Sequence, residues 1–133
     1  MFKWKSEYET GIKLIDEQHK KLFEIANRVY ELLMNDLYVD KYDMIIEVIN
    51  ELKDYTVYHF QTEEEYMIRA KYKKFFSHKA EHDEFIKKVK EVDLYSIDNM
   101  QNQYLLELLN FIVEWIEKHI LEVDKQLSKT IIP

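Results

Sequence analysis

The sequence contains no cysteine, one glycine and one proline, and it has no long apolar run. Without cysteine the chain cannot form a disulfide, a thiolate metal site, an iron–sulfur cluster or a cysteine nucleophile. Gly11 and the final Pro133 leave few places for tight turns, which favours long helices. No segment approaches about 18 apolar residues, and the N-terminus lacks the apolar run of a signal peptide. We therefore expect a cytoplasmic protein that does not insert into membranes.

Length and charge limit the architecture and the partners. A chain of 133 residues is long enough for one core and too short for two, so we expect a single domain over 1–133. The 26 acidic residues outnumber the 19 basic ones and give a net charge of −7, which disfavours nucleic acid and anionic membranes as partners. Because the outer helix faces carry charge, we expect a monomer.

Four amphipathic segments follow a short N-terminal arm that ends at the only glycine. In each segment the apolar residues recur at spacings of three and four, which predicts helices with one inner stripe. The expected elements are the arm over 1–11 and helices over about 12–37, 41–70, 75–92 and 99–127. Short connections between long helices predict an all-α fold, an antiparallel up-down-up-down four-helix bundle.

All five histidines fall on these inner stripes. His78 and His82 are four residues apart, so on a helix their rings lie within roughly 40° of each other, one turn apart. His19, His59 and His119 lie on the inner stripes of the first, second and fourth helices. One inner histidine is usually a satisfied core residue, whereas five converging histidines form an unpaired polar core unless something binds them. A metal ion is the simplest occupant.

Two carboxylates complete the predicted metal site. Glu63 lies one turn after His59 on the same face, whereas its neighbours Glu64 and Glu65 read as a solvated face. Asp124 follows His119 by five residues, about 140° away on a regular helix, and taken alone it reads as a surface acid. It becomes a candidate because five nitrogens and one carboxylate are too few for two six-coordinate ions. We therefore predict a π-type turn, or an early end to regular α-helix, between 117 and 125.

Four motifs spread along the chain carry a family resemblance. They are Phe2, Trp4, Tyr8, Gly11-Ile12, Ile15-Asp16, Gln18-His19 and Leu22-Phe23; His59-Phe60, Glu63-Glu64 and Met67; Tyr72, His78, His82 and Phe85; and Phe111, Trp115, His119-Ile120, Asp124 and Leu127. In these residues and their order the chain resembles the hemerythrins, particularly their single-domain bacterial forms. One departure is Lys73, where many relatives have proline. It leaves the expected ligands untouched, and we expect a looser loop before the third helix.

The resemblance implies a non-haem di-iron site with an oxo or hydroxo bridge. One iron would be held by His78, His82 and His119, the other by His19 and His59, and both by Glu63 and Asp124. O2 would bind at the open position of the iron with two histidines. The inner stripes place Ile15, Leu22, Tyr55, Trp115 and Ile116 around that position. The residues alone do not select iron, since such sites also bind zinc, copper or manganese.

Reversible O2 binding, for carriage, storage or delivery, is the favoured function, and we expect no enzymatic activity. The alternative is a di-iron oxidoreductase acting on peroxide or nitric oxide, which Tyr55 on the inner stripe would support, although a core tyrosine is the simpler interpretation. An O2 or redox sensor module is a further alternative. A haem-binding bundle fits less well, since a haem needs only one or two protein ligands. A metal-free interaction bundle also fits less well, because it would leave the inner histidines without partners. An electron-donor or O2-receiving protein is left open as a partner.

Overall fold

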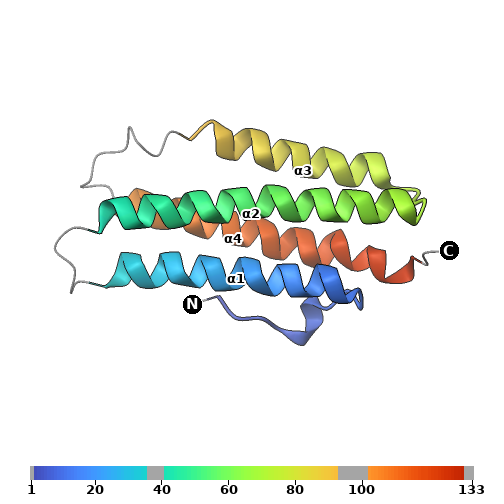
Figure 1. Ribbon diagram of the computed structural model, residues 1–133, viewed down its shortest axis with the longest axis horizontal. Coiled ribbons are helices and arrows are strands. Elements are labelled where there is room, and N and C mark those ends of the chain that lie inside the picture. The colour runs from blue at the N-terminus through green and yellow to red at the C-terminus, as the bar shows by residue number, and fades with distance from the viewer. Residues whose placement is uncertain (1, 36–40, 93–101, 131–133) are drawn as a thin grey trace.

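Four long helices lie side by side and run alternately in opposite directions (Figure 1). The computed structural model describes residues 2–35, 41–92 and 102–130. Within these ranges the α-helices are α1 (Lys13–Met34), α2 (Tyr42–Arg69), α3 (Phe75–Lys90) and α4 (Asn102–Glu122), and short 3-10 helices are η1 (Ser6–Tyr8) and η3 (Asp124–Lys129). The predicted all-α antiparallel four-helix bundle with a short N-terminal arm is confirmed.

The helix bounds differ from the predicted ones mainly at the end of α4. Its regular α-helix stops at Glu122, and a 3-10 helix begins at Asp124, so the predicted early end between 117 and 125 is confirmed. The helix expected to reach 127 is therefore shorter, because an apolar residue such as Leu127 continues the stripe equally well in a 3-10 turn. The expected ends near 37 and 99 lie outside the described residues. No described helix is long and apolar enough to cross a membrane.

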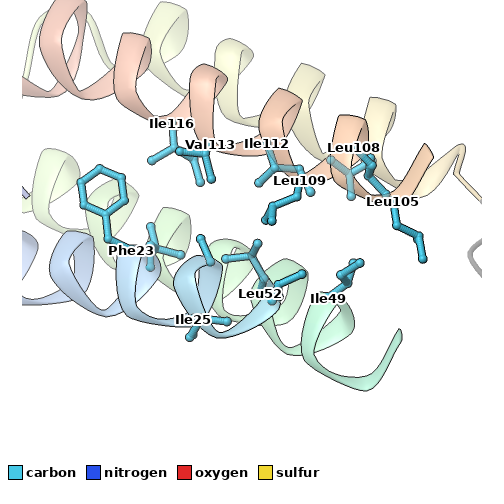
Figure 2. Packing of buried hydrophobic residues seen from close by; sticks show 14 of the residues in the cluster. Phe23, Ile25, Ile49, Leu52, Leu105, Leu108, Leu109, Ile112, Val113 and Ile116 are labelled. Carbon is cyan, nitrogen blue, oxygen red and sulfur yellow. The ribbon is translucent and has the colours of Figure 1, made fainter. Parts of the chain in front are cut away.

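Two apolar clusters of unequal size hold the bundle together. The larger one extends from the end of the bundle where α2 and α4 begin as far as Phe60 and Ile120, and its members include Phe23, Ile25, Ile49, Leu52, Leu105, Leu108, Leu109, Ile112, Val113 and Ile116 (Figure 2). The smaller cluster consists of Ile15, Met67 and Leu127, each at most 1% exposed. Each of these three lies about one helical turn from a predicted metal ligand, so the smaller cluster closes the site on the side away from the main core.

The N-terminal arm packs along α1 and is tied to it by polar contacts. Gly11 has a φ of 83°, and a side chain added there would meet nothing, so the predicted bend requires glycine for its backbone conformation alone. The carboxylate of Asp16, in the first turn of α1, accepts hydrogen bonds from the Thr10 N–H and hydroxyl, both at 2.8 Å, and from the Gly11 N–H at 3.1 Å. Upstream, the ring of Trp4 packs edge-on against Tyr8. The arm thereby covers the part of α1 that carries His19.

Candidate metal centre

Five imidazole rings, from all four helices, meet in one buried region near the end of the bundle where α1 begins. His19 comes from α1, His59 from α2, His78 and His82 from α3, and His119 from α4. None is more than 4% exposed. The antiparallel arrangement explains the meeting, because the first turns of α1 and α3 lie level with the last turns of α2 and α4 (Figure 1). Each ring turns its Nε2 atom towards the shared region.

Glu63 stands between two groups of these rings. Its Oε2 atom lies 3.2 Å from Nε2 of His19 and 3.1 Å from Nε2 of His59. Its Oε1 atom lies 3.1 Å from Nε2 of His82 and 3.5 Å from Nε2 of His78. The side chain is fully buried. One carboxylate therefore offers one oxygen to each group of histidines.

Asp124 makes the same division from the opposite side. Its Oδ2 atom lies 3.1 Å from Nε2 of His19, and its Oδ1 atom lies 2.9 Å from Nε2 of His78 and 3.1 Å from Nε2 of His119. The residue is 1% exposed. The change from α-helix to 3-10 helix after Glu122 brings it inward, because a regular helix would turn it away from His119.

The donor atoms form two adjoining sets. One set is His78, His82, His119, Glu63 and Asp124, the other is His19, His59, Glu63 and Asp124, and in each set the ligand atoms all lie within 4.8 Å of one another. Within the first set, Nε2 of His119 lies 3.1 Å from that of His82 and 3.2 Å from that of His78. Adjacent ligands of an octahedral ion with metal–nitrogen bonds of about 2.1 Å are separated by about 3.0 Å. The spacing of the rings fits ligation of one shared ion.

Two carboxylate oxygens in the site have close neighbours yet no hydrogen bond. Glu63 Oε1 and Asp124 Oδ1 are fully buried and accept no hydrogen bond from the part of the chain that the structure describes, although ring nitrogens lie 2.9–3.5 Å away. Burying such an acceptor without a partner costs about 1–3 kcal/mol. A carboxylate oxygen and a ring nitrogen take up this geometry when both face the same cation. The residues present therefore fit two cations, each with nitrogen and carboxylate donors.

A second layer of polar groups holds three of the rings by their Nδ1 atoms. The pairs are His59 with Gln18 Oε1 at 2.8 Å, His82 with Glu64 Oε2 at 2.9 Å, and His119 with Glu81 Oε1 at 3.3 Å. An Nδ1–H that donates to oxygen leaves the Nε2 lone pair free for a metal. The interpretation of Glu64 as part of a solvated face is wrong.

Sequence reasoning missed all three of these partners. The available signal is that Gln18, Glu64 and Glu81 each come directly before or after a predicted ligand in the sequence. One residue along a helix is about 100° around its axis. That rotation places each of them on the flank that faces a neighbouring helix, where it can reach a ring of that helix.

The imidazoles and carboxylates of the site shift one another's pKa values. Burial lowers the pKa of His19, but the adjacent carboxylates of Asp124 and Glu63 outweigh it and raise the pKa to about 9, and the same two carboxylates raise the pKa of His78 to about 9. Burial lowers the pKa of His59, which is neutral. Burial raises the pKa of both carboxyl groups, but the neighbouring imidazoles hold it below its usual range. Without a metal ion, two anionic carboxylates thus sit in the core beside two protonated imidazoles, and a bound cation would take the place of those protons.

A narrow space adjoins the set with two histidines. Besides His19, His59, His119 and Asp124, it is lined by Leu22, Phe60, Trp115, Ile116 and Ile120, and it has no room for a water-sized sphere. Trp115 stacks on His119 with ring centroids 4.6 Å apart. Phe60 stacks on His82 with centroids 3.9 Å apart. The walls are thus apolar or aromatic apart from the candidate ligands, and the space is dry.

Two of the five residues predicted to line this space lie elsewhere. Leu22, Trp115 and Ile116 are among its walls, but Ile15 is not, because it packs with Met67 and Leu127 in the smaller apolar cluster. Tyr55 is not on the inner stripe of α2. It is half-buried, its ring faces Tyr58 with centroids 5.7 Å apart, and it borders an outer groove of α2.

Comparisons with known proteins agree on one family. The family model described as the hemerythrin HHE cation binding domain matches residues 10–131. The chain is 55% identical over 126 residues to a bacteriohemerythrin of Clostridium acetobutylicum, covering 95% of this chain and 98% of that protein. It is 33% identical over 123 residues to a bacteriohemerythrin of Pseudomonas aeruginosa, covering 91% and 75%. A crystal structure of wild-type hemerythrin aligns with a TM-score of 0.78 at 25% identity, covering 96% of this chain and 95% of that one.

Proposed function

Because the chain belongs to the hemerythrin family, we propose that it holds two non-haem iron ions in the two adjoining donor sets and binds O2 reversibly. The observation that carries the proposal is the division of the donors. Glu63 and Asp124 each direct one oxygen to a set with three imidazoles and the other oxygen to a set with two. Such a division leaves the set with two imidazoles one donor short of its neighbour.

Iron is the metal that the family membership supports. Donor chemistry narrows the choice only partly, since imidazole suits iron, zinc, copper and nickel alike. The iron pair, when bound, supplies the redox chemistry by which O2 is held and released. The protein supplies neutral nitrogen donors and two linking carboxylates, and the outer partners Gln18, Glu64 and Glu81 keep three rings oriented.

The narrow space beside His19 and His59 supports reversible binding over oxidation of a substrate. Its walls, apart from the candidate ligands, offer no acidic, hydroxyl or phenol group among the described residues. An apolar, dry wall excludes water and proton donors, and both features slow the irreversible loss of bound O2. Tyr55, on which the oxidoreductase alternative depended, packs at the edge of the main core and borders a groove of α2, and it does not line the narrow space.

The test is repeated exposure of the anaerobically reduced, iron-loaded protein to air and then to vacuum. A visible absorption band should appear in air and disappear under vacuum over many cycles, and the bound O2 should be recovered each time. The Tyr55→Phe variant should cycle in the same way. If each exposure consumes O2 irreversibly, and Tyr55→Phe abolishes that consumption, the oxidoreductase alternative replaces the proposal.

A further inference from the structure

A hollow of about 500 Å³ opens between the α2–α3 connection and η3, at the end of the bundle nearest the candidate metal centre. We call it the basic hollow, and its lining residues include Lys71, Tyr72, Lys73, Lys74, Gln126 and Lys129. The ammonium group of Lys74 donates to Oε1 of Gln126 at 2.9 Å and thereby ties the connection to η3. In the described part of the chain, the ion pairs of lysine and arginine all involve other residues, so these four lysines keep their charge unpaired there.

The two segments that line the basic hollow are positively charged, in contrast with the rest of the chain. Residues 66–80 and 125–130 contain seven lysine or arginine residues and no aspartate or glutamate. The remainder therefore carries twelve basic and 26 acidic residues. Charge of one sign gathered around a concave surface steers partners of the opposite sign towards it.

The backbone at Lys71 is unusual for a lysine. Its φ is 52°, in the left-handed region, directly after the last turn of α2. Glycine or asparagine is the usual residue where a helix ends in this conformation, because a Cβ atom makes it less favourable. Strained positions concentrate at functional sites. A lysine here points to a use for its charge.

Tyr72 connects the basic hollow with the candidate metal centre. It lines the hollow, it is half-buried, and its ring lies edge-on to His78 with centroids 6.4 Å apart. The tyrosine ring therefore lies between the hollow and an expected iron ligand. An electron arriving at the hollow has a short, packed route to the centre.

We propose that the basic hollow is the docking surface for an acidic one-electron carrier protein that reduces the iron pair. The inference rests on the proposed function, because an iron pair that has lost its electrons to O2 must be reduced before it binds O2 again. Two encounters balance the reaction: two Fe(III) ions become two Fe(II) ions, and two reduced carriers each lose one electron. Electron-transfer complexes bury little area and depend on charge, as expected for a small hollow rimmed by lysines.

A protein fits the basic hollow better than an anionic membrane does. A flat bilayer surface cannot reach the inside of a hollow, whereas carboxylate side chains that protrude from a protein can. Phe76, in the first turn of α3, is 83% exposed, and Ile68, in the last turn of α2, is 63% exposed. Exposed apolar side chains near charged ones are the usual composition of a protein contact surface.

The experiment measures association of the iron-loaded, oxidised protein with a plant-type [2Fe–2S] ferredoxin, used as the acidic one-electron probe, by calorimetry. The test variant is Lys71→Glu/Lys73→Glu. The matched control is Lys87→Glu/Lys90→Glu, which makes the same charge change on exposed lysines in the last turn of α3, at the far end of that helix. Association should weaken about tenfold or more in the test variant and about twofold or less in the control at low salt.

A further variant, Lys71→Gly, separates docking from folding. It removes one charge of the basic hollow and relieves the backbone conformation at φ 52°, so association should weaken while thermal stability is kept or raised. Equal loss of association in test and control variants, binding that salt does not weaken, or binding to phosphatidylglycerol vesicles but not to ferredoxin would overturn the docking proposal. Cycling between air and vacuum needs no carrier, so it tests the proposed function separately.

Discussion

Replacing Ile116 by alanine should loosen the dry space without emptying the metal centre. Ile116 is 4% exposed and forms part of the wall of the space beside His19 and His59. The change removes three carbon atoms, about 2.4 kcal/mol of transfer free energy, and leaves a cavity, so the free energy of unfolding should fall by roughly 3 kcal/mol. The domain should remain folded, because domains of this size have about 5–15 kcal/mol of stability.

The matched control for this change is Ile49→Ala. Ile49 is 1% exposed in the main core and lies ten residues before His59 on α2, about 15 Å along the helix axis. Both variants should lose similar stability in denaturant titrations and keep the same iron content. Only Ile116→Ala should show several-fold faster oxidation of the reduced protein in air, followed by its visible spectrum, because only this change admits water to the space. Equal oxidation rates in the two variants would refute the role given to the dry walls.

Three further predictions concern polar groups around the centre. In the metal-free protein, the raised pKa values of His19 and His78, about 9, mean that their contribution to stability is complete below pH 6.5 and is lost as the pH rises through 9. Denaturant titrations at about pH 6 and about pH 9.5 should show a lower free energy of unfolding at the higher pH. Bound metal, which needs neutral imidazoles, should abolish this difference. Glu64→Gln, which weakens the hydrogen bond to Nδ1 of His82, should lower metal affinity about 10–100-fold in a competition titration with a chelator, with little change in fold by circular dichroism. Asp16→Ala, which removes three hydrogen bonds to the arm, should cost about 1–3 kcal/mol in denaturant titrations and leave the iron content unchanged.

The sequence was sufficient to predict the bundle and the meeting of seven polar side chains. The reason is that the four helices are long and contain no glycine or proline, so their inner stripes identify one face each. Asp124 is the least obvious member, since regular helical spacing turns it away from His119. It was predicted by counting the ligands that two ions need, and the helix end after Glu122 provides the required change of direction.

The inner stripe of α2 was read incorrectly at one step. After Leu52 the next buried residue could be Tyr55, three residues further, or Thr56, four residues further. Tyr55 was chosen because it is aromatic and Thr56 is polar. The structure buries Thr56 instead, 1% exposed, with its hydroxyl donating to the Leu52 carbonyl at 2.7 Å. A threonine that satisfies its own hydroxyl within the helix can be buried, and apolar periodicity does not detect it.

The outer partners of the histidines could not be found from periodicity for a related reason. Glu64 and Glu81 are partly exposed acids on polar helix faces, and most such acids are solvated. Their contacts with His82 and His119 depend on how closely neighbouring helices approach, which the pattern of a single helix does not specify. Only the packed bundle identifies them.

The number of iron ions per chain tests most directly whether the centre consists of two donor sets that Glu63 and Asp124 join. The protein is loaded anaerobically with Fe(II), desalted and analysed for iron and protein, beside the His78→Ala/His82→Ala variant. The unchanged protein should hold two ions per chain, and the variant, which keeps the His19 and His59 set, should hold at most one. One ion or none in the unchanged protein, or two in the variant, would contradict it.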